Sequence, residues 1–151
     1  MRVMLVAAEA YPYCKVGGLA DVVGALFKEM KKRGLRVNLA LPFYRKHIRV
    51  SNLNLLRKVQ IKMGPEAHAF EVYKTEEGVF LFDCPEFFGR AGVYAEDGTA
   101  YEDNPLRYAF FSRALLEFIK TEGMKPDILH LNDWQTALVP FYLRTFYKKD
   151  L

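Results

Sequence analysis

Ten residues near the start of the chain decide its fold, and they read Lys15-Val16-Gly17-Gly18-Leu19-Ala20-Asp21-Val22-Val23-Gly24. The run before them, residues 3–8, is continuously apolar, as is typical of a strand buried on both faces of a parallel sheet. After them, apolar side chains recur at helical spacing as far as Met30. The order of strand, glycine turn and helix predicts the first unit of an α/β domain.

The glycine turn is a candidate seat for an anion. Gly17 and Gly18 have no Cβ atom, so a ligand could approach the backbone closely and a positive φ would be allowed. The first amides of a helix lack partners inside it, and the helix dipole favours negative charge there. Because Lys15 adds a positive charge at the same end, we interpret the turn as a seat for a diphosphate or a carboxylate. A tight turn without a ligand is the alternative, since the segment matches neither G-x-x-x-x-G-K-[ST] nor G-x-G-x-x-G.

The next elements extend this unit into a mixed sheet. A helix that ends at Gly34 and a strand at 36–41 complete a parallel βαβ unit. The stretch 43–54 has no clear pattern, and we interpret it as a loop. Shorter strands are expected at 58–63, 70–74 and 79–83, with a hairpin turn between the last two. These strands predict an antiparallel insertion that returns to a buried strand.

The last third of the chain predicts helix, strand and helix. Asn104 and Pro105 have the residue types of an N-cap and a first helical position, and the helix they begin is apolar nearly all round up to about Glu122. A buried strand is expected at 127–131. The helix after it contains Pro140, which would kink or interrupt it. The fold class predicted is therefore α/β, a Rossmann-like, mostly parallel sheet with helices on both faces and an antiparallel hairpin insertion.

Polar residues follow the strand at 127–131 and form a second candidate site. Ligands of open α/β sheets bind beyond the carboxyl ends of the strands, so Asn132 and Asp133 are expected on the same rim as the glycine turn. Asp133 is also suited to cap the next helix, and a purely structural capping role is the alternative. We interpret His130 as a hydrogen-bonded histidine of the core and Trp134 as a packing residue.

The segment between Cys84 and Asn104 has more hydrogen-bonding side chains than a simple connection needs. Tyrosine rings can stack on a pyranose and carboxylates can accept hydrogen bonds from sugar hydroxyls, so this segment is a candidate sugar-binding loop. A mobile lid without specific contacts is the alternative. The residues concerned are Arg90, Tyr94, Glu96, Asp97, Tyr101 and Asp103.

Composition sets the class of protein. A length of 151 residues with 51% hydrophobic side chains predicts one folded domain with a real core. The net charge of +4 is spread along the chain, which indicates at most a weak preference for anions and does not demand nucleic acid. No apolar run approaches the length of a membrane span. Cys14 and Cys84 form neither a disulfide framework nor a metal-binding spacing, and we expect reduced thiols in a cytoplasmic protein.

Four segments in order resemble the glycogen synthases of bacteria and the starch synthases of plants. The first is similar to the K-x-G-G-L-A-D-V signature of that family, and the fourth has an asparagine where some bacterial members have the second histidine of H-x-H-D-W. Asparagine is familiar there in plant starch synthases. The segments are Glu9 with Lys15–Gly24, Arg90–Tyr94, Tyr101–Phe110 and His130–Leu138.

The resemblance implies a retaining glucosyltransferase that needs neither a metal nor another cofactor. Such an enzyme transfers glucose from ADP-glucose to the non-reducing end of an α-1,4-glucan, glycogen or a maltooligosaccharide, and has two Rossmann-like domains facing across a cleft (the GT-B architecture). Residues 1–151 would be most of the first, glucan-acceptor domain. The catalytic histidine and the nucleotide-sugar domain would lie beyond Leu151, so we expect the chain alone to be inactive.

The same resemblance assigns roles to individual residues. Lys15 and the backbone of Gly17 and Gly18 would face the donor diphosphate. Asp133 and Asp21 would be catalytic, and further substrate-binding residues would be Glu9, Tyr94 and Asn132. Two other classes of protein remain open: a non-catalytic glucan- or anion-binding module that uses the same cleft, and a free-standing flavodoxin-like binding domain, which the four ordered motifs disfavour.

Overall fold

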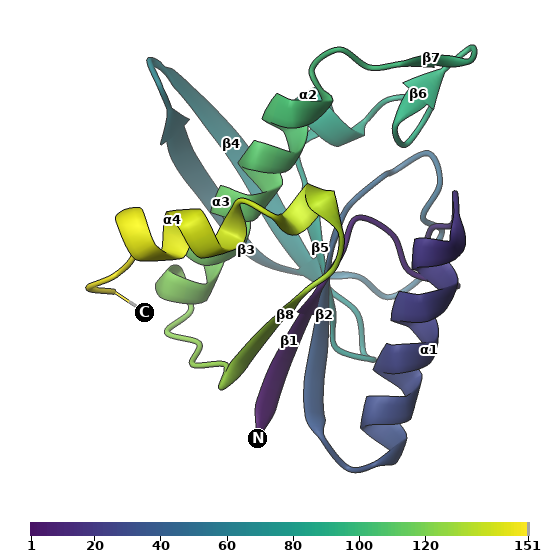
Figure 1. The fold of residues 1–151 in the computed structure, drawn as a ribbon, viewed down its shortest axis with the longest axis vertical. Coiled ribbons are helices and arrows are strands. Elements are labelled where there is room, and N and C mark those ends of the chain that lie inside the picture. Colours follow the sequence, from purple (N-terminus) through teal and green to yellow (C-terminus); the bar gives the residue numbers. More distant parts are fainter. Residues whose placement is uncertain (151) are drawn as a thin grey trace.

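The computed structural model describes residues 1–150 and shows one sheet between two layers of helices (Figure 1). Helix α1 covers one face of the sheet, and α3 and α4 lie on the other. The strands are β1 (Arg2–Val6), β2 (Arg36–Pro42), β3 (Asn54–Met63), β4 (Glu66–Lys74), β5 (Val79–Asp83) and β8 (Ile128–Leu131), with a separate small ladder of β6 (Ala95–Glu96) and β7 (Thr99–Ala100). The helices are α1 (Gly18–Lys32), α2 (Pro85–Phe88), α3 (Asn104–Thr121), the 3₁₀ turn η1 (Trp134–Thr136) and α4 (Val139–Thr145).

The sheet confirms the predicted fold class. Its strand order is β3-β4-β5-β2-β1-β8. Strands β5, β2, β1 and β8 pair in parallel, and the β3–β4 hairpin adds to the β5 edge in antiparallel register. Among the parallel strands the chain order is third, second, first, fourth, so the direction of winding reverses between β1 and β8. This reversal is the switch point at which open α/β sheets bind ligands.

The core forms where the sequence is continuously apolar. Strand β1 lies between two parallel neighbours, and Met4 to Ala8 are fully buried. On the face of the sheet opposite α1, α3 packs aromatic side chains against β5, as the contact of Phe118 with Phe82 shows. Ten residues of α3 are buried, which confirms the helix predicted to be apolar nearly all round.

Several element boundaries differ from the sequence-based expectation. The hairpin strands β3 and β4 begin four residues earlier than expected, because most of β3 is exposed and its polar residues weaken the alternation. The N-cap of α3 is Asp103 rather than Asn104, whose side chain instead donates to the Tyr94 carbonyl. Strand β8 was expected to be buried, but it forms an edge of the sheet and its residues are only partly buried or exposed.

The expected last helix is two elements. Its first turn, η1, ends at Thr136, and α4 begins at Val139. Pro140 therefore lies in the first turn of a new helix, where its missing N–H is not needed. The proline does interrupt the helix, as expected, but the chain responds by starting a second helix rather than by a kink.

Gly24 is the glycine of the quoted stretch that the packing requires. A Cβ atom at this position would lie 2.3 Å from the Tyr11 carbonyl oxygen. Residues 10–14 cross α1 at this point, where the Tyr11 amide donates to the Ala20 carbonyl at 2.9 Å. Within the described residues, a Cβ atom at Gly18 would meet nothing closer than 4 Å. One glycine therefore serves the fold, whereas the other has no such packing role.

We predict that Gly24→Ala lowers the free energy of unfolding by about 1–2 kcal/mol, because overpacking costs roughly 1–3 kcal/mol and the helix propensity of alanine recovers part of it. Urea unfolding of the chain measures the difference. Gly18→Ala is the matched control and is expected to be as stable as the unchanged chain or slightly more so. Equal stability of the two variants would contradict the close approach of Tyr11 to α1.

Candidate functional site

The carboxyl ends of β1 and β8 are tied together at the switch point. The Val6 carbonyl accepts hydrogen bonds from the backbone amide of Asn132, at 3.0 Å, and from its side-chain amide, at 2.9 Å. The loop after β1 therefore lies next to the turn after β8, and the segment before α3 passes above both (Figure 1). As expected, the rim brings Asn132 and Asp133 to the same edge of the sheet as the glycine turn.

Glu9 lies beneath the glycine loop, which we define as residues 15–18. Its side chain is only 3% exposed. One carboxylate oxygen, Oε2, accepts hydrogen bonds from the amides of Val16, at 2.6 Å, and Gly17, at 3.0 Å. Two of the amides at the candidate anion seat are thus already used by a carboxylate of the chain itself. The structure places Glu9 as a support of the loop rather than as an exposed wall of a cleft.

The two glycines of the loop are not explained by its backbone geometry. Gly17, the N-cap of α1, has an extended backbone with φ −136° and ψ −163°. Neither Gly17 nor Gly18 is among the glycines with positive φ, and a Cβ atom on either would meet nothing within 4 Å in residues 1–150. A tight turn therefore does not account for them. Their open backbone leaves room for a ligand at the start of α1.

Lys15 and Asp21 form an ion pair at the mouth of this seat. The Lys15 ammonium lies 2.8 and 2.7 Å from the two carboxylate oxygens of Asp21, and both side chains are about half exposed. Pairs at such exposed positions contribute little to stability, typically about 0–1 kcal/mol. A phosphate could therefore replace Asp21 beside Lys15 at small cost. The pair also places Asp21 directly at the seat that the sequence assigned to the donor.

Asp133 has an unusual backbone conformation. Its φ of 62° and ψ of −179° lie in a region that is essentially restricted to glycine. The side chain accepts a hydrogen bond from the Trp134 amide at 2.7 Å, which confirms the predicted capping role. The Thr136 hydroxyl donates to the carbonyls of Asn132 and Asp133, each at 3.1 Å, and holds the turn in this shape. Strain of this kind is concentrated at functional sites, and the carboxylate is exposed.

Tyr94 brings the segment between α2 and α3 to the site. Its hydroxyl donates to Glu9 Oε1 at 2.9 Å and accepts from Gln135 Nε2 at 3.0 Å. Burial raises the pKa of the Tyr94 phenol well above its ordinary value, and the neighbouring Tyr108 and Glu9 raise that pKa further. The hydroxyl therefore remains a hydrogen-bond donor at neutral pH.

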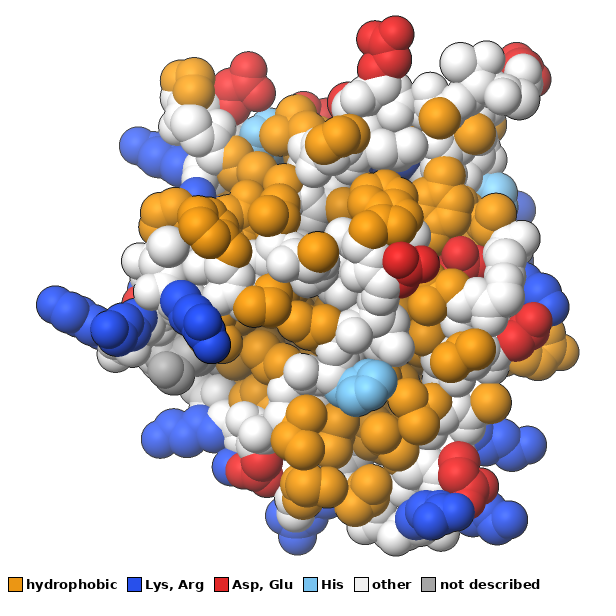
Figure 2. Space-filling model, in the orientation of Figure 1, with side chains coloured by type: hydrophobic (Ala, Val, Ile, Leu, Met, Phe, Trp, Pro, Cys, Tyr) orange, Lys and Arg blue, Asp and Glu red, His pale blue; other side chains and the backbone are white. Residues whose placement is uncertain are grey.

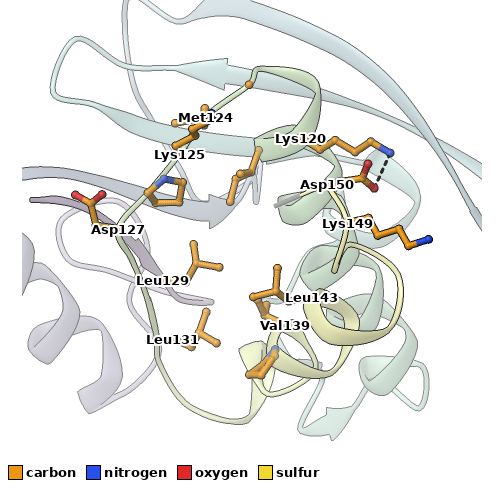
Figure 3. Close-up of a pocket in the computed structure, with 14 residues that line it drawn as sticks. Lys120, Met124, Lys125, Asp127, Leu129, Leu131, Val139, Leu143, Lys149 and Asp150 are labelled. Carbon is orange, nitrogen blue, oxygen red and sulfur yellow. Dashed lines mark ion pairs between the residues drawn. The ribbon is translucent and has the colours of Figure 1, made fainter.

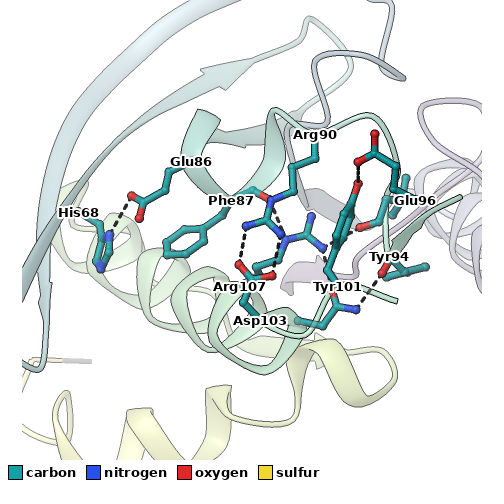
Figure 4. A network of polar contacts seen from close by, with 11 residues as sticks. His68, Glu86, Phe87, Arg90, Tyr94, Glu96, Tyr101, Asp103 and Arg107 are labelled. Atoms are coloured by element: carbon teal, nitrogen blue, oxygen red, sulfur yellow. Dashed lines mark hydrogen bonds and ion pairs between the residues drawn. The ribbon is translucent and has the colours of Figure 1, made fainter. Parts of the chain in front are cut away.

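The segment that contains Tyr94 is held by specific contacts within the chain (Figure 4). Arg90 forms a two-pronged ion pair with Asp103, which lowers the pKa of that carboxyl group. The Tyr101 hydroxyl accepts from the Gly92 amide at 3.0 Å and donates to Glu96 at 2.9 Å. These bonds close the segment on itself ahead of α3.

Two residues of the site were not singled out by their chemistry in the sequence. Gln135 and Arg107 are almost fully buried, and the hydrogen bonds of Gln135 to Tyr94 and of Arg107 to the Phe87 carbonyl tie the site together. Both lie within segments that resemble the synthases. The signal that could have found Arg107 is a charged residue on a helix that is otherwise apolar nearly all round.

The structure corrects the interpretations of Trp134 and His130, because neither side chain is fully buried. Trp134 packs edge-on against Tyr108, with ring centroids 5.1 Å apart, but it is 50% exposed and so is not simply a packing residue. His130 is only partly buried because β8 is an edge strand, and its Nδ1 lies 3.4 Å from the side-chain nitrogen of Asn132.

An apolar cavity lies away from this site. It has a volume of about 790 Å³, is lined by apolar side chains such as Leu129, Leu131, Val139 and Leu143, and opens between β8, α4 and the end of α3 (Figure 3). None of the candidate site residues lines it. The cavity lies beside the edge strand β8, whereas the candidate site lies at the carboxyl ends of the strands.

Basic side chains lie mostly around the border of the face in Figure 2, and apolar ones gather over its middle. Within residues 1–150, no group of three or more His, Cys, Asp or Glu side chains is placed to hold a metal ion. None of the helices in that range is both long and apolar enough to cross a membrane.

The fold and the rim together define the chain as an open α/β domain of the kind found in GT-B glycosyltransferases. More particularly, the chain belongs to the starch synthase catalytic domain family, whose model matches residues 2–151. This membership confirms the resemblance seen in the four sequence segments.

Individual relatives agree with this assignment. The chain is 42% identical over 149 residues to a glycogen synthase of Aquifex aeolicus, with 98% of this chain and 32% of the relative covered. It is 41% identical to glycogen synthase 2 of Geobacter metallireducens, covering 95% of this chain and 31% of that protein. The catalytic domain of starch synthase IV from Arabidopsis thaliana, bound to ADP and acarbose, superimposes with a TM-score of 0.83 at 35% identity, covering 99% of this chain and 31% of that one. The chain therefore spans about a third of the length of the relatives it matches.

We predict that Asp133→Gly raises the free energy of unfolding by about 1 kcal/mol. Relief of a backbone strain worth roughly 1–3 kcal/mol outweighs the few tenths lost when glycine replaces a capping residue. Thermal and urea unfolding measure the change. Asp133→Ala is the matched control, because it loses the cap and keeps the Cβ atom, and it is expected to be less stable than the unchanged chain. If glycine destabilised the chain as much as alanine does, the turn would not be strained.

Proposed function

We propose that the protein carrying this chain is a glycogen or starch synthase that transfers glucose from ADP-glucose to the non-reducing end of an α-1,4-glucan, with retention of configuration. Residues 1–151 would be its N-terminal, acceptor-side domain. The observation that carries the proposal is the position of Lys15 and the start of α1 on the rim at the switch point, the same rim that presents the exposed carboxylate of Asp133. Membership of the starch synthase catalytic domain family and the match to a protein bound to ADP and acarbose support it.

The geometry supports different roles for the two ends of the rim. Lys15, with the backbone of Gly17 and Gly18, would bind the donor diphosphate, because a cation and a helix N-terminus both favour phosphate oxygens. Asp133 and Asp21 are proposed to act near the transferred glucose. Asp21 would first have to release Lys15, with which it is paired.

The chain would supply only one wall of the cleft. Catalysis of group transfer depends on groups held around the transition state from several sides, and loss of a single electrostatic partner costs about a hundredfold to a thousandfold in rate. The relatives are about three times as long as this chain. We therefore propose that the chain alone transfers no glucose and can still bind an acceptor glucan weakly. We also propose a cytoplasmic location, which the two free cysteines support.

We predict that Lys15→Ala weakens the binding of ADP to the chain by about tenfold or more. A charge-assisted hydrogen bond is worth about 1.5–3 kcal/mol, and tenfold corresponds to about 1.4 kcal/mol. Titration with ADP, followed by NMR, measures the dissociation constant even when binding is weak. Lys32→Ala, at the opposite end of the same helix, is the matched control and is expected to change little.

Equal ADP affinity in the Lys15→Ala and Lys32→Ala variants would show that Lys15 does not bind the diphosphate. Failure of the unchanged chain to bind ADP at any accessible concentration would count against a diphosphate contact on this domain. Addition of a maltooligosaccharide in place of ADP tests the acceptor role separately, and its binding is expected to be insensitive to Lys15→Ala.

A further inference from the structure

The Tyr94 hydroxyl lies between polar groups of two separate segments. It donates to Glu9 Oε1 and accepts from Gln135 Nε2. A phenol has a single proton, and a carboxylate can only accept, so that proton serves Glu9 and the Gln135 amide must be the second donor. The donor of each hydrogen bond is therefore fixed: Gln135 donates to Tyr94, and Tyr94 donates to Glu9.

Each partner of Tyr94 is in turn attached to one half of the site. The other carboxylate oxygen of Glu9 holds the amides of Val16 and Gly17 in the glycine loop. Gln135 lies in η1, the turn that Asp133 caps, and is only 3% exposed. The Tyr94 hydroxyl thus connects the glycine loop to the turn that presents Asp133.

The backbone around Tyr94 is held as well (Figure 4). The side-chain amide of Asn104 donates to the Tyr94 carbonyl at 2.9 Å. The guanidinium of Arg107, which is 0% exposed, donates to the carbonyls of Val93 at 2.9 Å and Phe87 at 2.7 Å. The tyrosine is therefore presented by α3 and not by a freely moving loop.

We propose that Tyr94 and Gln135 are positioning residues, which set the glycine loop and the Asp133 turn in register before any ligand binds. The structural role of Tyr94 and Gln135 does not depend on the proposed function. Its importance for catalysis does, because a synthase would need the donor seat and Asp133 at a fixed separation. The rival explanation is direct contact of Tyr94 with a sugar. The hydroxyl has already given its proton to Glu9 and one lone pair to Gln135, so it has little capacity left for a ligand.

The test is made on the chain without a ligand. In Tyr94→Phe, the ring stays and both hydrogen bonds are lost. The amide protons of Val16 and Gly17 are expected to exchange with solvent at least tenfold faster and to change their NMR chemical shifts, because their acceptor Glu9 is no longer held. Tyr101→Phe is the matched control, since it removes a hydroxyl of the same segment that bonds to Glu96 and the Gly92 amide instead.

Gln135→Leu provides the independent variant, and it carries the test if Tyr94→Phe fails to fold. Gln135 makes no hydrogen bond to the glycine loop among those of residues 1–150, so a response of the Val16 and Gly17 amides has to pass through Tyr94. We expect exchange about threefold faster or more at those two amides, with a thermal midpoint close to that of Tyr101→Phe. A role in general stability would instead change exchange throughout the core.

Unchanged exchange and chemical shifts of both amides in a folded Tyr94→Phe or Gln135→Leu chain would overturn the proposal. The same result in Tyr101→Phe as in Tyr94→Phe would also overturn it, because the effect would then belong to the segment as a whole. None of these readings involves ADP. Absence of ADP binding would therefore contradict the proposed function alone and leave the positioning role standing.

Discussion

The buried carboxylate of Glu9 is the constraint on which the rim of this domain depends. A charge removed from water is costly unless donors surround it, and Glu9 finds three: the amides of Val16 and Gly17 and the hydroxyl of Tyr94. These donors come from the start of α1 and from a segment more than seventy residues further along the chain. The buried charge of Glu9 thereby joins its own loop after β1 to the start of α1 and to the segment that contains Tyr94.

The internal carboxylate also changes how the anion seat works. Part of the positive end of α1 is already neutralised by Glu9, and Lys15 is paired with Asp21. A ligand would therefore replace Asp21 beside Lys15 rather than bind an unpaired cation. The bonds from Val16 and Gly17 to Glu9 hold the loop in one conformation, so that less order has to be gained on binding.

Much of the fold could be predicted from local patterns, since β1, α1 and α3 have continuous or periodic apolar residues that tertiary contacts did not override. The length of the hairpin strand β3 was underestimated, because an exposed strand lacks a clear alternation of apolar and polar residues. The position of Glu9 could not be predicted, because a carboxylate after a buried strand looks the same whether it faces a ligand or the interior. The hydrogen bond from Tyr94 makes Glu9 face the interior, and no local sequence pattern connects these two residues. The φ of Asp133 was equally hidden, since aspartate rarely adopts that conformation.

The central claim is that the ligand seat lies at the switch point between β1 and β8, and not in the apolar cavity beside α4. NMR mapping of amide shifts during an ADP titration of the unmodified chain tests this claim most directly. The account predicts that the largest changes fall within residues 15–21 and 132–136. Changes centred on the residues that line the cavity, such as Ile119, Leu129 and Leu143, would contradict it.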